Sequence, residues 1–193
     1  MADEPTIAFP TVAEATSWFE TNHTTATGFW LKIAKGAHAG TTVNYDQVLD
    51  IALCFGWIDG QKKPLDDKFW LQRFSPRKAR SRWSKRNRGK AEGLIDAGQM
   101  RPAGVREVEA ARADGRWDAA YEGQKSATVP EDLRAALDAD PEAGAFFETL
   151  SGVNRFAILY RVGDAKKPET RAARIAKFVT MCHNHETIHP QKS

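Results

Sequence analysis

The sequence predicts an α+β fold, with a small antiparallel β-sheet and packed helices in the N-terminal half and an all-helical C-terminal region. Two observations carry this prediction. Short alternating, aromatic-rich segments that are typical of strands lie in the first half, whereas apolar residues recur every three to four positions in the last third. With 193 residues, the chain can bury one substantial core or two small ones.

Two helices are expected among the strands of the first half. Thr11 caps a helix over residues 11–22, because Glu14 follows three positions later in a capping-box pattern. Asn44 caps a second helix that runs to about Phe55. Both helices place their apolar residues on one side, so each needs a sheet or another helix to cover it.

Three strands are expected, and together they form the antiparallel sheet. Residues 29–35 alternate between apolar and polar side chains, and residues 57–63 follow Gly56, which ends the second helix in a left-handed conformation. Residues 69–75 are rich in aromatic side chains and stop at Pro76. Since the three strands are short and close in sequence, the helices are expected on one face of a small sheet.

From Ser84 onward the apolar period is that of helices, with helix starts at Ser84, Pro102, Pro141, Ser151 and Pro168. The polar stretch 122–129 is the best candidate for a linker. The expected organisation is an α+β domain over 1–121, a linker over 122–129, a helical region over 130–183 and a frayed tail over 184–193.

Positive charge is concentrated in one segment, although the net charge of the chain is only +3. Residues 73–90 hold nine basic side chains and no acidic one. Clustered Arg and Lys bind phosphate and carboxylate groups, and aromatic faces stack on bases. The sequence therefore predicts an anion-binding surface made by Lys62, Lys63, Arg73, Arg77, Arg80, Arg82, Lys85 and Arg86, with Trp57, Trp70 and Trp83 as stacking or pocket residues. The alternative is a solvated charged face with Trp83 in the core.

A second interpretation is a small enzyme. Asp59 lies between Ile58 and Gly60 in an unusual turn and is the candidate general acid or base, with Arg and Lys side chains holding an anionic substrate. The alternative is that Asp59 hydrogen-bonds its own backbone in the turn, as Asp commonly does. The common nucleotide-binding and hydrolase motifs are absent, and no cofactor is expected.

A third interpretation is a helical interaction module in which Phe146, Phe147 or Tyr160 contacts a protein partner or a second copy, although this spacing is also typical of a core. The histidines near Cys182 match no zinc-ligand spacing, so no metal is expected. The acidic start and the lack of a long apolar run predict a cytoplasmic protein that does not insert into membranes.

Several strings of residues occur together in one known family. They are Cys54–Gly60, Leu71–Arg77, Ser81–Asn87, Met100–Gly104, Gly115–Tyr121 and the helical stretch Phe146–Phe178. On these strings, within about residues 9–190, the chain resembles the YdeI/OmpD-associated, bacteriocin-protection family. Arg86 stands where that family pattern has an apolar residue. The resemblance implies protection against bacteriocins or envelope stress, and it brings no catalytic role, cofactor or ligand set. Because of the basic segment 73–90, binding of nucleic acid or of a phosphorylated or carboxylated ligand is the preferred interpretation among the three.

Overall fold

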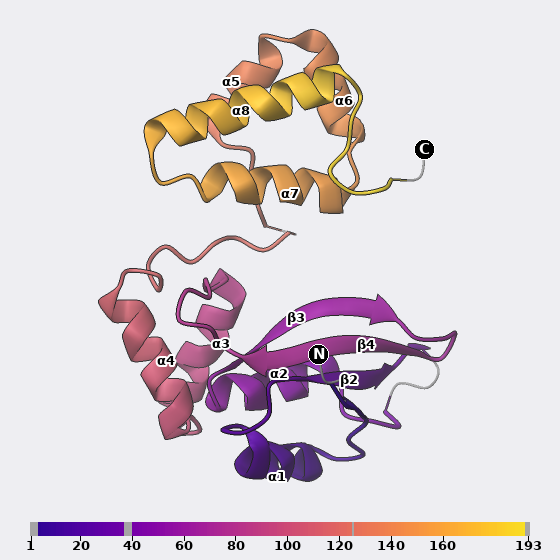
Figure 1. The fold of residues 1–193 in the computed structure, drawn as a ribbon, viewed down its shortest axis with the longest axis vertical. Helices are drawn as coiled ribbons and strands as arrows, with labels where there is room; N and C mark the ends of the chain where they lie inside the picture. The colour runs from indigo at the N-terminus through magenta and orange to yellow at the C-terminus, as the bar shows by residue number, and fades with distance from the viewer. Residues whose placement is uncertain (1–3, 37–39, 125, 192–193) are drawn as a thin grey trace. The chain divides into compact units, whose positions relative to one another are not determined.

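The computed structural model describes residues 4–36, 40–124 and 126–191. The chain divides into two compact units, residues 1–120 and residues 121–193 (Figure 1). Each unit has its own cluster of buried apolar side chains. They are called unit 1 and unit 2.

Unit 1 contains a four-stranded sheet with strand order β1-β2-β4-β3. The strands are β1 (Thr6–Ile7), β2 (Phe29–Ala34), β3 (Trp57–Pro64) and β4 (Phe69–Pro76). The antiparallel pairs β2–β4 and β3–β4 confirm the predicted sheet. The sheet as a whole is mixed, because β1 adds to β2 in parallel. This strand was not predicted, since two residues are too short to show an alternating pattern.

Four helices complete the described part of unit 1, namely α1 (Val12–Asn22), α2 (Tyr45–Cys54), α3 (Lys85–Asp96) and α4 (Pro102–Ala113). The predicted caps are present: Thr11 accepts a hydrogen bond from the Glu14 amide, and Asn44 and Gln47 form a reciprocal capping box. Ser84 accepts a hydrogen bond from the Asn87 amide at the start of α3. Because side-chain acceptors satisfy the free N–H groups of a first turn, these residues fix where the helices begin.

The core of unit 1 lies between one face of the sheet and the helices α1 and α2 (Figure 1). Phe29 and Leu31 of β2 and Phe74 of β4 are completely buried on this inner face. The Phe19 ring of α1 packs edge-on against Trp57, with ring centroids 5.3 Å apart. The inner face therefore provides the apolar surface that the amphipathic helices need.

Two glycines, Gly56 and Gly104, allow the end of β4 and the start of α4 to lie close to the end of α2. Gly56 has a φ of +75°, as the sequence predicts, and its carbonyl accepts a hydrogen bond from the Arg77 amide at 3.0 Å. Gly104 of α4 lies against the last turn of α2, where an added Cβ would come within 2.6 Å of the Leu53 carbonyl oxygen. A side chain at residue 104 is therefore incompatible with this packing.

Unit 2 is helical throughout its regular structure, as predicted, with α5 (Glu131–Asp138), α6 (Pro141–Thr149), α7 (Gly152–Gly163) and α8 (Pro168–His183). Leu133, Leu137, Phe147 and Ile158 are almost completely buried in its core. The predicted linker has no helix in its described residues 122–124 and 126–129, and Val129 already packs against this core. No helix in the described ranges is long and apolar enough to span a membrane.

The segment after α8 differs from the expected frayed tail. Asn154 of α7, which is 1% exposed, donates to the His189 carbonyl and accepts from the His189 amide. The Gln191 side chain accepts a hydrogen bond from the Ser151 amide at 2.7 Å. Residues 184–191 are therefore held against the start of α7 by a buried polar side chain, and residues 192–193 lie outside the described ranges.

Candidate functional site

Part of the predicted cationic surface is neutralised by acidic side chains of the protein itself. Several basic residues in segment 73–90 form ion pairs with carboxylates of unit 1. The pairs are Arg73–Glu4, Arg86–Asp46, Arg88–Glu92 and Lys90 with both Asp46 and Asp50. The sequence does not reveal three of these partners, because Glu4, Asp46 and Asp50 lie far away along the chain.

The Arg73–Glu4 pair is bidentate. The Arg73 Nε and Nη2 atoms donate to the two carboxylate oxygens of Glu4 at 2.7 and 2.5 Å. The hydrogen bonds from Arg73, followed by its charge, lower the pKa of the Glu4 carboxyl. Fork-to-fork pairs of this kind have the strongest directional preference among protein ion pairs, so Arg73 is committed to the N-terminal segment rather than to an external anion.

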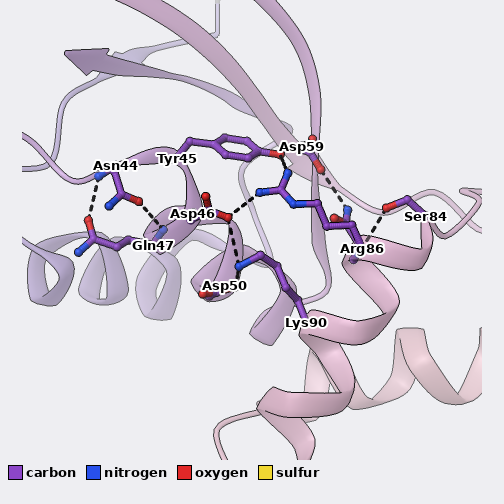
Figure 2. Close-up of polar contacts among 10 residues, drawn as sticks. Asn44, Tyr45, Asp46, Gln47, Asp50, Asp59, Ser84, Arg86 and Lys90 are labelled. Atoms are coloured by element: carbon purple, nitrogen blue, oxygen red, sulfur yellow. Dashed lines mark hydrogen bonds and ion pairs between the residues drawn. The ribbon is translucent and has the colours of Figure 1, made fainter. Parts of the chain in front are cut away.

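A second group of ion pairs joins α2 to α3 (Figure 2). The Asp46 carboxylate faces Arg86 at 2.5 Å and Lys90 at 3.2 Å, and Asp50 faces Lys90 at 2.7 Å. Burial opposes ionisation of Asp46, but the hydrogen bonds and charges of Lys90 and Arg86 outweigh it and lower the pKa. Arg86, the residue that departs from the resembled family, thus fastens α3 to α2.

Asp59 lies beside this group and joins three elements (Figure 2). The Tyr45 hydroxyl of α2 donates to Asp59 Oδ2 at 2.8 Å, and the Asn87 amide of α3 donates to Asp59 Oδ1 at 3.1 Å. Arg86 Nη1 in turn donates to the Tyr45 hydroxyl at 3.2 Å. Burial first, and then the neighbouring Asp59 charge, raises the pKa of Tyr45 above its ordinary value.

This geometry differs from the turn that the sequence suggested for Asp59. Both of its oxygens accept hydrogen bonds from side chains of other elements rather than from the local backbone. Tyr45 and Asn87 were missed as partners because they lie 14 and 28 residues away from Asp59 in the chain. The arrangement ties β3 to α2 and α3 and is that of a structural clamp.

The aromatic residues predicted for stacking lie mostly inside unit 1. Trp57 and Trp83 are each 1% exposed, whereas Trp70 is half-buried on the inner face of the sheet. The Arg77 guanidinium, also buried, lies over the Trp83 ring with 3.5 Å between its Cζ and the ring centroid. Trp83 and Arg77 therefore form a buried cation–π pair, worth about 2 kcal/mol where such pairs are desolvated.

The remaining predicted cations lie at the surface together with Lys78, which was not among the predicted binding residues. Lys78 and Arg80 are exposed in the connection between β4 and α3, and Arg82 there is half-buried. Lys85 is exposed in the first turn of α3, and Lys62 and Lys63 are exposed on β3. We call the exposed group Lys78, Arg80 and Lys85 the loop surface.

The backbone beneath the loop surface is held by its own hydrogen bonds. The Lys78 amide donates to Ser81 Oγ at 3.0 Å, and the Ser81 amide donates to the Lys78 carbonyl at 2.8 Å. Arg116 Nη1 donates to the Ser81 carbonyl at 2.8 Å. These bonds define the conformation of the turn and thereby limit the positions that the Lys78 and Arg80 side chains reach.

The residue types that could hold a metal or act as nucleophiles have other surroundings. His183 lies 3.0 Å from an Asp140 carboxylate oxygen, and His185 lies 2.7 Å from Glu142. The described ranges contain no group of three or more such side chains arranged for a metal ion. Cys54 and Cys182 are buried free thiols, and burial raises the pKa of each to about 11. Thiolate chemistry at either residue is therefore suppressed near neutral pH.

The side chains suggested for a helical interaction surface are largely in the core of unit 2. Phe147 is fully buried, and the half-buried Phe146 stacks on His185 with ring centroids 4.8 Å apart. Tyr160 is half-buried and packs edge-on against Tyr121. Their helical spacing thus reflects packing within the unit.

Two family models match the chain, one in each unit. A domain of unknown function, DUF8412, matches residues 7–107, and the family described as "Bacteriocin-protection, YdeI or OmpD-Associated" matches residues 126–185. The second match is confined to unit 2, whereas the resembling strings reached into unit 1. No curated protein and no solved structure matches the chain. The chain belongs to the DUF8412 family, whose model covers residues 7–107, and its residues 126–185 are similar to the bacteriocin-protection, YdeI or OmpD-associated family.

Proposed function

We propose that unit 1 of this bacteriocin-protection-type protein binds an anionic partner through the loop surface. The observation that carries the proposal is the exposure of three basic side chains, Lys78, Arg80 and Lys85, within eight consecutive residues. All three side chains are exposed to solvent. Such a local positive field attracts phosphate or carboxylate groups and accelerates their association.

The position of the loop surface at the start of α3 strengthens this field. The first turn of α3 contains basic side chains and no acidic one. The N-terminus of a helix already carries about half a positive charge, so Lys85 and Arg86 are placed against the preference of the helix dipole. An anion bound there relieves this repulsion and meets backbone N–H groups as well as side-chain donors.

The proposal places the protein in the cytoplasm, where polyphosphate, nucleic acids and phosphorylated metabolites are abundant. The free, buried thiols Cys54 and Cys182 are compatible with a reducing compartment. The family name of residues 126–185 suggests that unit 2 supplies the protective role, while unit 1 holds the anionic ligand.

Inorganic polyphosphate is a suitable first probe, because it offers a row of phosphates without bases or sugars. Its affinity for the whole protein is expected to fall steeply between 50 and 200 mM salt, since each neutralised phosphate releases counterions. The triple variant K78Q/R80Q/K85Q is expected to bind at least about tenfold more weakly and to lose most of the salt dependence.

A matched variant separates local from global charge effects. K166Q/K167Q/K177Q removes the same charge from exposed lysines of unit 2. It is expected to retain the affinity of the unmodified protein for polyphosphate. Equal losses in both triple variants, or no binding of polyphosphate at low salt, would show that the loop surface is not the binding site.

A further inference from the structure

The sheet of unit 1 has an outer face, opposite α1 and α2, with its own set of side chains. Directly paired residues project to the same side of an antiparallel sheet, so the pairs Lys32–Leu71 and Ala34–Phe69 share this face with Trp30. Trp30 and Phe69 are half-buried, and neither belongs to the core cluster of unit 1. The outer face therefore presents two aromatic rings that the core does not use.

A lysine ammonium group lies over each of these two rings. Lys63 Nζ lies 4.1 Å from the centroid of the Trp30 ring, and Lys32 Nζ lies 3.9 Å from the centroid of the Phe69 ring. Because β4 lies between β3 and β2, the Lys63 side chain crosses the middle strand to reach Trp30. An ammonium group over the ring shows that this side of the ring opens towards the surface rather than into packed side chains.

Aromatic rings that lie next to ammonium groups on a sheet are complementary to the bases and phosphates of a nucleic acid strand. Unpaired bases stack on aromatic side chains, and the phosphates between them pair with neighbouring cations. A flexible lysine that covers a ring can move aside to a phosphate as a base takes its place. A single strand with accessible bases offers a partner for the flat faces of the rings as well as for the ammonium groups, so the combination favours it.

We infer that the outer face binds single-stranded nucleic acid, with Trp30 and Phe69 stacking on bases and Lys32 and Lys63 pairing with phosphates. The inference rests on the proposed function, since it names the partner whose phosphates the loop surface attracts. β4 connects the two regions: Phe69 lies near its start, and Lys78 follows its end at Pro76. The eight residues of β4 are separated by seven steps and span roughly 23 Å, a distance that a strand of several nucleotides covers.

Two acidic side chains near this face, Glu4 and Asp66, have partners within the protein. Glu4 is held by Arg73, and the Asp66 carboxylate accepts hydrogen bonds from the amides of Lys68 and Phe69 in the β3–β4 turn. Lys35 Nζ donates to the Asp66 carbonyl at 2.7 Å. The repulsion between Asp66 and an incoming phosphate is thus offset by neighbouring lysines.

The test compares two anionic oligomers that differ only in their bases. The whole protein is titrated with a dye-labelled oligo(dT) of about 12 nucleotides and with an abasic phosphodiester oligomer of the same length. The unmodified protein is expected to bind oligo(dT) more tightly than the abasic oligomer. W30L and F69L, which keep apolar bulk but lose the ring, are each expected to weaken oligo(dT) binding about tenfold and to leave abasic binding unchanged.

Two further variants show whether the effect belongs to the rings of this face. W30F keeps an aromatic ring and is expected to retain oligo(dT) affinity, whereas W70L removes a ring from the inner face and is expected to change it little. Quenching of tryptophan fluorescence by oligo(dT), reduced in W30F, provides a readout on the folded, fully binding protein.

The outcomes separate this inference from the proposed function. Equal affinity for oligo(dT) and the abasic oligomer, with K78Q/R80Q/K85Q still weakening both, would overturn the inference and leave the proposed function standing. No binding of either oligomer or of polyphosphate at low salt would overturn both. If the protein binds a duplex more tightly than oligo(dT), the inference is overturned. It is also overturned if W30L leaves oligo(dT) binding unchanged and alters only the sedimentation of the protein alone, because the face then contacts a second copy of the chain.

Discussion

The Tyr45 hydroxyl donates a hydrogen bond to the Asp59 carboxylate at 2.8 Å, and Arg86 donates to the same hydroxyl at 3.2 Å. The phenol thus lies between a carboxylate and a guanidinium that do not contact each other directly in this network. It joins the first turn of α2 to β3 and to the first turn of α3. The stability of unit 1 therefore depends on a polar side chain at a position that the sequence pattern marks only as the start of a helix.

Replacing Tyr45 by Phe is expected to destabilise the protein by about 1–2 kcal/mol, because the half-buried Asp59 carboxylate loses one of its two donors. Urea unfolding of Y45F, D59N and the double variant measures the coupling between the two residues. A coupling energy near zero in this cycle would contradict the clamp.

Alkaline pH is expected to weaken the same clamp. The pKa of Tyr45 is raised in the folded state, so its contribution is fully present below the ordinary tyrosine pKa of about 10 and is lost as pH rises beyond it. Thermal unfolding midpoints measured from pH 8 to 11 should decline more steeply for the unmodified protein than for Y45F. Parallel curves for the two proteins would count against this origin of the decline.

The Asp46 carboxylate pairs with Arg86 and Lys90 and so reduces the net positive charge at α3. Replacing Asp46 by a neutral residue is therefore expected to increase anion binding. D46N leaves Lys90 paired with Asp50, and polyphosphate should bind about twofold to threefold more tightly at low salt. The stability change is expected to stay within about 0.5 kcal/mol, since the Asp46 side chain is 59% exposed. D138N removes the same charge from unit 2 and should leave the affinity unchanged; a similar gain there would point to net charge alone.

Gly104 is expected to reject alanine even though alanine favours helices. G104A places a Cβ against the carbonyls at the end of α2 and should destabilise the protein by about 1–3 kcal/mol. G93A is the matched substitution, because an added Cβ at residue 93 of α3 meets nothing within 4 Å. It should stabilise the protein by about 0.5–1 kcal/mol in the same urea titration. If both variants shift the free energy of unfolding in the same direction, the conclusion that α4 packs too closely against α2 to accept a side chain at residue 104 is contradicted.

Local signals in the sequence predicted the elements of this fold well. Thr11, Asn44 and Ser84 each cap the helix that they were expected to start, and Gly56 has the left-handed conformation expected after α2. Caps and glycine conformations are decided by neighbours within four residues, so they are readable from one sequence. The two-residue strand β1 was missed because its parallel pairing with β2 has no local signature.

The candidate site was predicted only in part, because charges are neutralised across long stretches of chain. The cluster in segment 73–90 is visible in the sequence, but the pairing of Arg73 with Glu4 spans 69 residues and that of Arg86 with Asp46 spans 40. The stacking residues were also predicted only in part, because the sequence does not show which aromatic side chains are buried. Trp57 and Trp83 lie in the core, whereas Trp30, which was not among the predicted residues, lies on the outer face.

The way in which α3 is held has a consequence for the order of folding. Its first turn opposes the helix dipole, and a helix of 12 residues is marginal in isolation. Its anchors, Asp59, Asp46 and Asp50, belong to β3 and α2 and are 28 to 40 residues away. A free peptide of this segment is therefore expected to stay largely coil, and α3 is expected to become ordered during refolding only after α2 and β3 have met.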